Sequence, residues 1–413
     1  MDLFISQDWF LYTTVSLAIS SVSVLPELYA YYKSKEAWLP VNLPPYMIGD
    51  DYHYFTLLNF IHRRFLNYFY GCSLEYPNLT VNSRFQLFGF LFNLIPYHVG
   101  YLLADRRFGV LLVRLWNRFL LGISFYFLYE VISTATGNPR PHLSEIIASL
   151  LVFLMLYPGP LNIGIRSSIF FNFYKKDHIY TQSNSNDLFR AMFSETTAPI
   201  FLASLAFLLN LSESCTVSTT SIVLAIFFLV ALFFHYPPVA VVFGVLLFSL
   251  GLLRSDLYIL VSSVVVTVGL TVSYAYFLQK DPVAKELFVH EKKQRLFVLI
   301  PKRFVSVLLI IFPAISLGLL QVIIGNFSVG SVLIILSIFS VGYVLKQQQL
   351  SRFFFRGSAI GLQASIVITI FQIEAFKAHH YTLLAILLFF IFWSYFAKQA
   401  KYLYDNLATR CEE

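Results

Sequence analysis

Two adjacent carboxylates, Asp50 and Asp51, are the residues of this sequence whose types and spacing best suit chemistry. They follow a proline-rich stretch and Gly49, and they precede Tyr52 and His53. One carboxylate of such a pair can act as a general base toward an acceptor hydroxyl. The pair, together with His53, can also bind a divalent cation such as Mg²⁺ or Mn²⁺. The structural alternative is that one Asp caps the following helix while the other is solvated.

The residues after the acidic pair have the period of a helix that lies flat in the membrane interface. The polar face of this helix is formed by Thr56, Asn59, Arg63 and Asn67. The apolar face is formed by Leu58, Ile61, Phe65 and Phe69. The predicted catalytic and metal-binding residues are Asp50 and Asp51. The predicted substrate-binding residues are Tyr52, His53, Arg63 and Arg64.

Two arginines, Arg114 and Arg118, interrupt a long apolar stretch and are four positions apart, hence on one helical face. At 1.5 Å per residue from Phe108, they lie about 9 and 15 Å deep in a spanning helix. A charge at such depth is costly and marks a functional candidate. Arg114 can reach the inner surface by snorkelling. Arg118 either pairs with an acidic side chain of another span or faces a cavity that receives a phosphate.

The composition excludes a soluble protein. Of the 413 residues, 58% are hydrophobic and 12% charged, and the mean hydropathy is +0.70. A soluble domain is about 45–50% apolar and about 25% charged. Three Cys exclude a disulfide scaffold, and the basic residues form no patch that predicts a nucleic-acid partner. The expected fold class is an all-α polytopic membrane protein.

The elements that must position these residues are about twelve apolar segments, each near the roughly 20 residues that cross a bilayer. They cover residues 10–31, 86–104, 108–134, 144–165, 192–211, 218–236, 237–254, 256–278, 303–325, 327–345, 357–375 and 379–397. Pro237 and Pro238 mark a helix end rather than a kink. The long loop over residues 32–85 is where function is expected to concentrate.

The distribution of Lys and Arg predicts the orientation. With the N-terminus in the cytoplasm, nineteen of the 29 basic residues fall inside, eight outside and two within the span at 108–134. This bias predicts that both termini are cytoplasmic. Loop 32–85 is then external, so Lys33 and Arg63 lie outside while Arg106 lies inside.

The segment Gly49-Asp50-Asp51-Tyr52-His53-Tyr54, placed after the first span and before an interfacial helix, resembles the type C (GT-C) glycosyltransferases. These integral membrane enzymes use polyprenyl-phosphate-linked sugars as donors. The resemblance covers residues 1–250 best, and the later spans match as generic membrane helices. It implies a GT-C-like catalytic module at 1–254, including external loop 32–85, and additional transmembrane helices at 255–413 with a cytoplasmic C-terminus.

The resemblance also implies a mechanism. An acceptor hydroxyl attacks the anomeric carbon, Asp50 or Asp51 takes its proton, and the lipid phosphate leaves toward basic side chains. The donor-phosphate candidates are Arg118, Arg114 and Arg190. The charge count places Arg190 inside, which contradicts this role unless the 144–173 region forms two short helices. The acceptor is a cell-envelope glycan, a glycolipid or a protein such as a pilin, and membrane lipids surround the enzyme.

The location that this resemblance implies is the bacterial inner (cytoplasmic) membrane, with the active site facing the periplasm or exterior. Two alternatives come from other classes. A glycolipid flippase or transporter would use Arg118 and His98 along a central path, and it tends to have internal symmetry, which this sequence does not show. An O-antigen-type polymerase usually carries its large external loop late in the chain, whereas here the large loop comes first.

Overall fold

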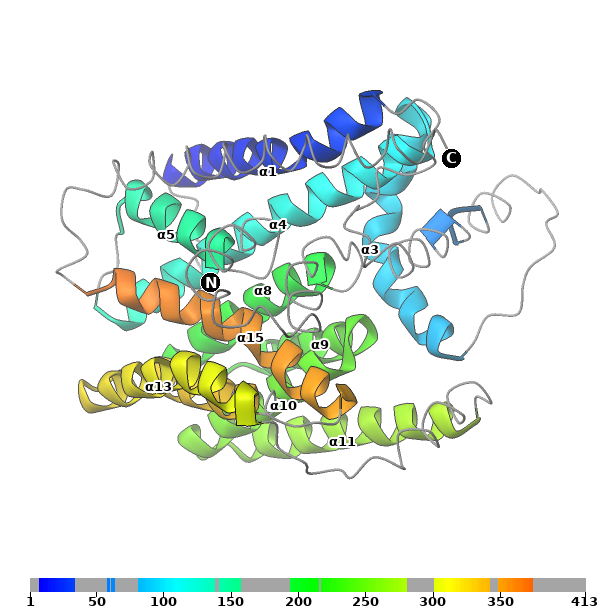
Figure 1. The fold of residues 1–413 in the computed structure, drawn as a ribbon. Coiled ribbons are helices and arrows are strands. Elements are labelled where there is room, and N and C mark those ends of the chain that lie inside the picture. Colours follow the sequence, from blue (N-terminus) through cyan, green and yellow to red (C-terminus); the bar gives the residue numbers. More distant parts are fainter. Residues whose placement is uncertain are drawn as a thin grey trace.

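The computed structural model describes residues 7–33, 58–59, 61–63, 81–137, 141–156, 194–214, 217–280, 301–341 and 348–373. All the elements it describes are helices, which confirms the all-α prediction (Figure 1). Their bounds are α1 Gln7–Lys33, α3 Val81–Leu103, α4 Arg106–Ala135, α5 Leu143–Leu156, α8 Ser194–Glu213, α9 Thr219–His235, α10 Pro237–Arg254, α11 Leu257–Lys280, α13 Pro301–Ile323, α14 Phe327–Val341 and α15 Gln348–Phe371.

The predicted spans from 10–31 to 357–375 each overlap one of these helices, and the span at 379–397 lies outside the described residues. Within the described part of the chain, three helices are long and apolar enough to cross a membrane: Arg106–Ala135, Pro237–Arg254 and Leu257–Tyr276. The break predicted at Pro237 and Pro238 is confirmed, because α9 ends at His235 and α10 begins at Pro237. Proline suits that first helical position because its missing N–H would be unpaired there anyway.

Helix α4 is the central element, and it contacts α1, α3, α5, α8 and α15. It begins after Asp105, whose side chain accepts a hydrogen bond from the Phe108 amide and so caps the first turn. It ends before Gly137, whose φ of +83° lies in the left-handed region that favours glycine. Because neighbours cover most of its surface, α4 carries both core side chains and buried polar ones.

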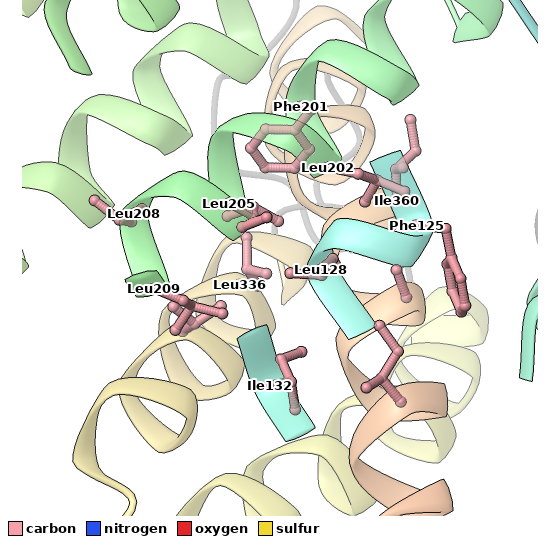
Figure 2. Close-up of a cluster of buried hydrophobic side chains, with 14 of the residues drawn as sticks. Phe125, Leu128, Ile132, Phe201, Leu202, Leu205, Leu208, Leu209, Leu336 and Ile360 are labelled. Carbon is pink, nitrogen blue, oxygen red and sulfur yellow. The ribbon is translucent and has the colours of Figure 1, made fainter. Parts of the chain in front are cut away.

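The core joins α4 to α8 and to the later helices α14 and α15 (Figure 2). In this view, α8 runs from Phe201 to Leu209 in much the same direction as α4 runs from Phe125 to Ile132. Helices α4 and α8 are therefore parallel, as the spans at 108–134 and 192–211 predicted. Leu336 and Ile360 belong to the same buried cluster, so helices on both sides of the predicted boundary at residue 254 share one core.

Helix α1 runs antiparallel to α4 (Figure 1). The Tyr12 hydroxyl donates a hydrogen bond to the Gly122 carbonyl (2.7 Å), and the earlier Trp9 packs on the later Phe127, with ring centroids 5.3 Å apart. The prediction placed one crossing between these helices, and helices separated by one crossing must be parallel. In the structure α1 and α4 are antiparallel, which contradicts the predicted parallel arrangement. Therefore α1, α3 and α4 cannot be three consecutive membrane-spanning helices.

Candidate functional site

Most of the predicted site residues lie outside the part of the chain that the structure describes. These are Asp50, Asp51, Tyr52, His53, Arg64 and Arg190. The remaining predicted residues, Arg63, Arg114 and Arg118, are described and fall into two separate polar regions. The structure therefore locates the predicted phosphate-binding arginines of α4 and one substrate-binding arginine.

The first polar region is formed where residues 58–59 and 61–63 pack against the last two turns of α3. The His62 Nε2 and His98 Nδ1 atoms are 2.8 Å apart and share one hydrogen bond. The Tyr97 hydroxyl donates to the Asn59 Oδ1 atom (3.3 Å). The His62 ring contacts Tyr97 and Tyr101 edge-on, with centroids 5.1 and 4.9 Å apart. We call this set of five side chains the histidine cluster.

The electrostatic field at the histidine cluster is positive. The pKa of His62 is lowered from 6.5 to about 4, mainly by burial and then by His98, Arg106 and Arg63, in that order. His62 is 1% exposed, so its ring is a neutral imidazole at neutral pH. A neutral His62 therefore adds no charge of its own beside the two arginines.

The histidine cluster brings together two residues that the prediction placed on opposite sides of the membrane. Arg63 and Arg106 both act on His62, which lies against the end of α3 remote from Val81. Arg63 therefore lies on the same side as the α3–α4 turn, which corrects its assignment to the face opposite Arg106. The error arose because loop 32–85 was counted as one external segment, although Lys33 at the end of α1 and Arg63 lie toward the Arg106 side.

The second polar region lies inside the bundle on α4. The Arg114 side chain is 0% exposed and Arg118 is 8% exposed, so both point into the protein, as their shared helical face predicted. The snorkelling expected of Arg114 does not occur. Burial of two guanidinium groups four residues apart is expensive and requires polar surroundings.

Polar side chains from neighbouring helices lie at the same depth as the two arginines. In the α3–α4 hairpin, Tyr97 packs on Gly109, so Asn93, one turn earlier, lies near the level of Arg114. Asn93 is buried, as is Asn117 between the two arginines. His235 of α9 is buried at this level too, because its ring lies 5.1 Å from that of Phe92.

Glu145 of α5 is a buried acidic residue that lies at a different level from the two arginines. The stacked rings of Phe125 and Phe153 align α4 with α5, and from that pair Glu145 lies about 12 Å in the direction away from Arg118. The two groups are therefore roughly 20 Å apart along the helix axes.

The structure gives Tyr97 and His98 a hydrogen bond each, to Asn59 and to His62. Sequence reasoning had named His98 as a residue of a transport path. Sequence reasoning did not single out His62, although His62 lies within residues 56–69, the predicted helix on whose polar face Arg63 was placed. The signal was weak, because a contact between residues 36 positions apart leaves no local pattern. Among the described residues, no group of three His, Cys, Asp or Glu side chains could hold a metal ion. The predicted cation ligands Asp50 and Asp51 lie outside that set.

The fold and these two polar regions define a helical membrane protein. The histidine cluster lies beside the α3–α4 turn, and two arginines are buried in the interior. Comparison of the chain with protein-family models, with curated proteins and with solved structures finds no match.

Proposed function

We propose that this protein is a membrane glycosyltransferase that moves a sugar from a polyprenyl phosphate to a cell-envelope acceptor. The observation that carries the proposal is the burial of Arg114 and Arg118 on one face of the central helix α4. A lipid phosphate is the anion that a membrane enzyme meets most often, and guanidinium groups bind phosphate in a bidentate manner. In a low-dielectric interior this interaction is stronger than in water.

The chemistry assigns one task to each region. The acceptor oxygen forms a bond to the anomeric carbon while the bond between that carbon and the phosphate oxygen breaks. Asp50 or Asp51 accepts the acceptor proton, and the arginines stabilise the charge that remains on the leaving phosphate. A divalent cation at the acidic pair would supply further positive charge to the phosphate.

The proposal places a strict demand on orientation. Asp50 and Asp51 lie in sequence between Lys33 and Arg63. Lys33 ends α1, which is antiparallel to α4, and Arg63 acts on the same His62 as Arg106. An external acidic pair therefore requires the α3–α4 turn to be external as well. The positive-inside count puts that turn in the cytoplasm, so the two predictions compete and measurement must decide between them.

The activity test compares Asp50→Asn and Asp51→Asn with a matched control, Glu213→Gln, at an exposed position that ends α8. Membranes that contain each variant receive native polyprenyl-linked sugars, and mass spectrometry follows sugar transfer to envelope polymers. We expect one Asp variant to lose transfer at least about 100-fold, the lower range for a general base. Full activity of both Asp variants would exclude the acidic pair. Chelation followed by Mg²⁺ or Mn²⁺ addition tests the cation.

A second candidate function, transport of an anionic glycolipid, is favoured by the depth of Arg118. A positive charge in the middle of the bundle can bind a phosphate that crosses the membrane as well as one that reacts. The discriminating result is lipid movement in reconstituted vesicles without any change in the lipid's sugar. Such movement, retained in both Asp variants and lost in Arg118→Gln, would support transport over sugar transfer.

A further inference from the structure

We propose that Arg63 and Arg106 form a binding site for the phosphate group of a membrane lipid beside the α3–α4 turn. The site is distinct from the buried arginines of α4. The inference rests on the membrane location that the proposed function also assumes, but it does not depend on sugar transfer.

The first argument is the charge balance at the turn. Asp105 is already engaged, because one of its oxygens caps the Phe108 amide (2.9 Å) and the other binds Arg107 (3.0 Å). Among the described residues, neither Arg63 nor Arg106 makes a hydrogen bond or an ion pair. Within the described part of the chain, no carboxylate therefore pairs with these two guanidinium groups, which both act on the same buried imidazole.

The second argument is the way that the histidine cluster holds the site. The hydrogen bond between His62 and His98 fixes residues 61–63 against α3, so Arg63 does not need to be ordered when a ligand binds. This preorganisation reduces the entropic cost of binding. The aromatic side chains of Tyr97 and Tyr101 form one wall beside His62. The His62 ring is neutral at neutral pH, so it adds no positive charge beside the two arginines.

The third argument identifies the ligand as a lipid. Leu102 and Leu103 end α3 next to the cluster and are 69% and 68% exposed, and Tyr101 stands on the same turn. Exposed leucines beside a tyrosine and basic residues are typical of the level where acyl chains meet headgroups. A phosphate carried on an apolar chain can contact the arginines and the leucines together. The first turn of α4 adds the positive end of its dipole.

The experiment uses the full-length protein in phosphatidylcholine nanodiscs and measures lipid binding by native mass spectrometry. The probes are decaprenyl phosphate, phosphatidylglycerol and decaprenol, which lacks the phosphate. We expect the Arg63→Gln/Arg106→Gln double variant to bind decaprenyl phosphate at least about 10-fold more weakly than the wild type, equivalent to about 1.4 kcal/mol. The control variant Lys280→Gln removes one positive charge at the end of α11 and should bind normally.

The outcomes separate the sources of the phosphate. Weakened binding of decaprenyl phosphate alone identifies a polyprenyl site, and equal weakening for phosphatidylglycerol identifies a general phospholipid site. Equal binding of decaprenol, or normal binding by the double variant, would overturn the proposal. If the double variant does not fold, wild-type protein is labelled with a photoactivatable decaprenyl phosphate, and labels away from Arg63 and Arg106 would also overturn it. Lipid binding that persists in Asp50→Asn, with transfer lost, separates this site from the proposed catalysis.

Discussion

At the scale of single residues, His62 shows how a membrane protein can hold an ionisable ring in a basic environment. Its ring is buried, shares a hydrogen bond with His98, and interacts electrostatically with the charges of Arg63 and Arg106. Each of these factors disfavours a proton on the ring. The pKa of about 4 is therefore a consequence of packing at the α3–α4 turn, and it makes the stability of the turn depend on pH.

We predict that acid destabilises the protein through His62. The pKa of His62 is about 4 in the folded protein and 6.5 in an unfolded chain. Between these pH values the unfolded chain binds a proton at His62 that the folded protein does not bind, so the free energy of unfolding falls as pH falls. His62→Gln should reduce this dependence, measured as the change in melting temperature between pH 7 and pH 5 in detergent. The control is His142→Gln, at an exposed histidine. Equal pH dependence in both variants would contradict the prediction.

We also predict that buried and surface arginines of α4 differ in their contribution to stability. Arg114→Leu leaves buried polar neighbours without their charged partner, so the free energy of unfolding should fall by about 2–3 kcal/mol. Arg107→Gln breaks an ion pair at the more exposed turn, which should change it by less than about 1 kcal/mol. Unfolding titrations in mixed micelles measure both. Similar losses in the two variants would mean that the burial of Arg114 is not the cause.

At the scale of elements, the hairpins are assembled through glycines. Gly100 and Gly109 allow α3 and α4 to approach, because a Cβ on Gly100 would lie 2.6 Å from the Gly109 Cα. The same device joins α13 to α14, where a Cβ on Gly330 would lie 2.7 Å from the Gly318 carbonyl oxygen. Small residues of this kind are typical of helix contacts in membranes, since packing rather than the hydrophobic effect drives association there.

This arrangement gives a matched pair of alanine substitutions. Gly100→Ala should separate α3 from α4 and lower the free energy of unfolding by about 1–3 kcal/mol. Gly269→Ala adds the same methyl group on α11 where nothing lies within 4 Å, so stability should be unchanged or rise by up to about 1 kcal/mol. Thermal unfolding of the two variants side by side makes the comparison. A larger loss for Gly269→Ala would refute the close-packing explanation.

At the scale of the whole molecule, hydropathy predicted the helices well and their directions less well. The spans from 86–104 onward overlap helices because about 20 apolar residues in a row leave the backbone few alternatives to a helix. The direction of α1 depends instead on which partner it packs against, here α4 through Tyr12 and Gly122. Similarly, the sequence showed that Arg114 and Arg118 share a face, but the pairing of His62 with His98 is a tertiary contact without a local signal.

The topology yields a prediction that single cysteines can test in a variant without the three native ones. Gln7→Cys and Thr134→Cys should react with an impermeant maleimide from one face of the membrane, and Ala104→Cys from the other. The reason is that α1 and α4 are antiparallel, so the start of α1 lies toward the end of α4. Labelling of Gln7→Cys and Ala104→Cys from the same face would contradict the packing. Labelling of Ala104→Cys from the cytoplasm would exclude an external acidic pair.

The central position of α4 has a consequence for biogenesis. Its core partner α8 begins at Ser194, and α15 begins at Gln348, so both are synthesised well after α4 has left the ribosome. Until then, the surroundings of Arg114 and Arg118 are incomplete, because α9, which contributes the buried His235 at their level, is also synthesised later. We expect α4 to wait beside the translocon, in contact with water or a chaperone, until α8 arrives. A nascent chain that stops before Ser194 would present two incompletely surrounded arginines to the membrane's quality-control proteases.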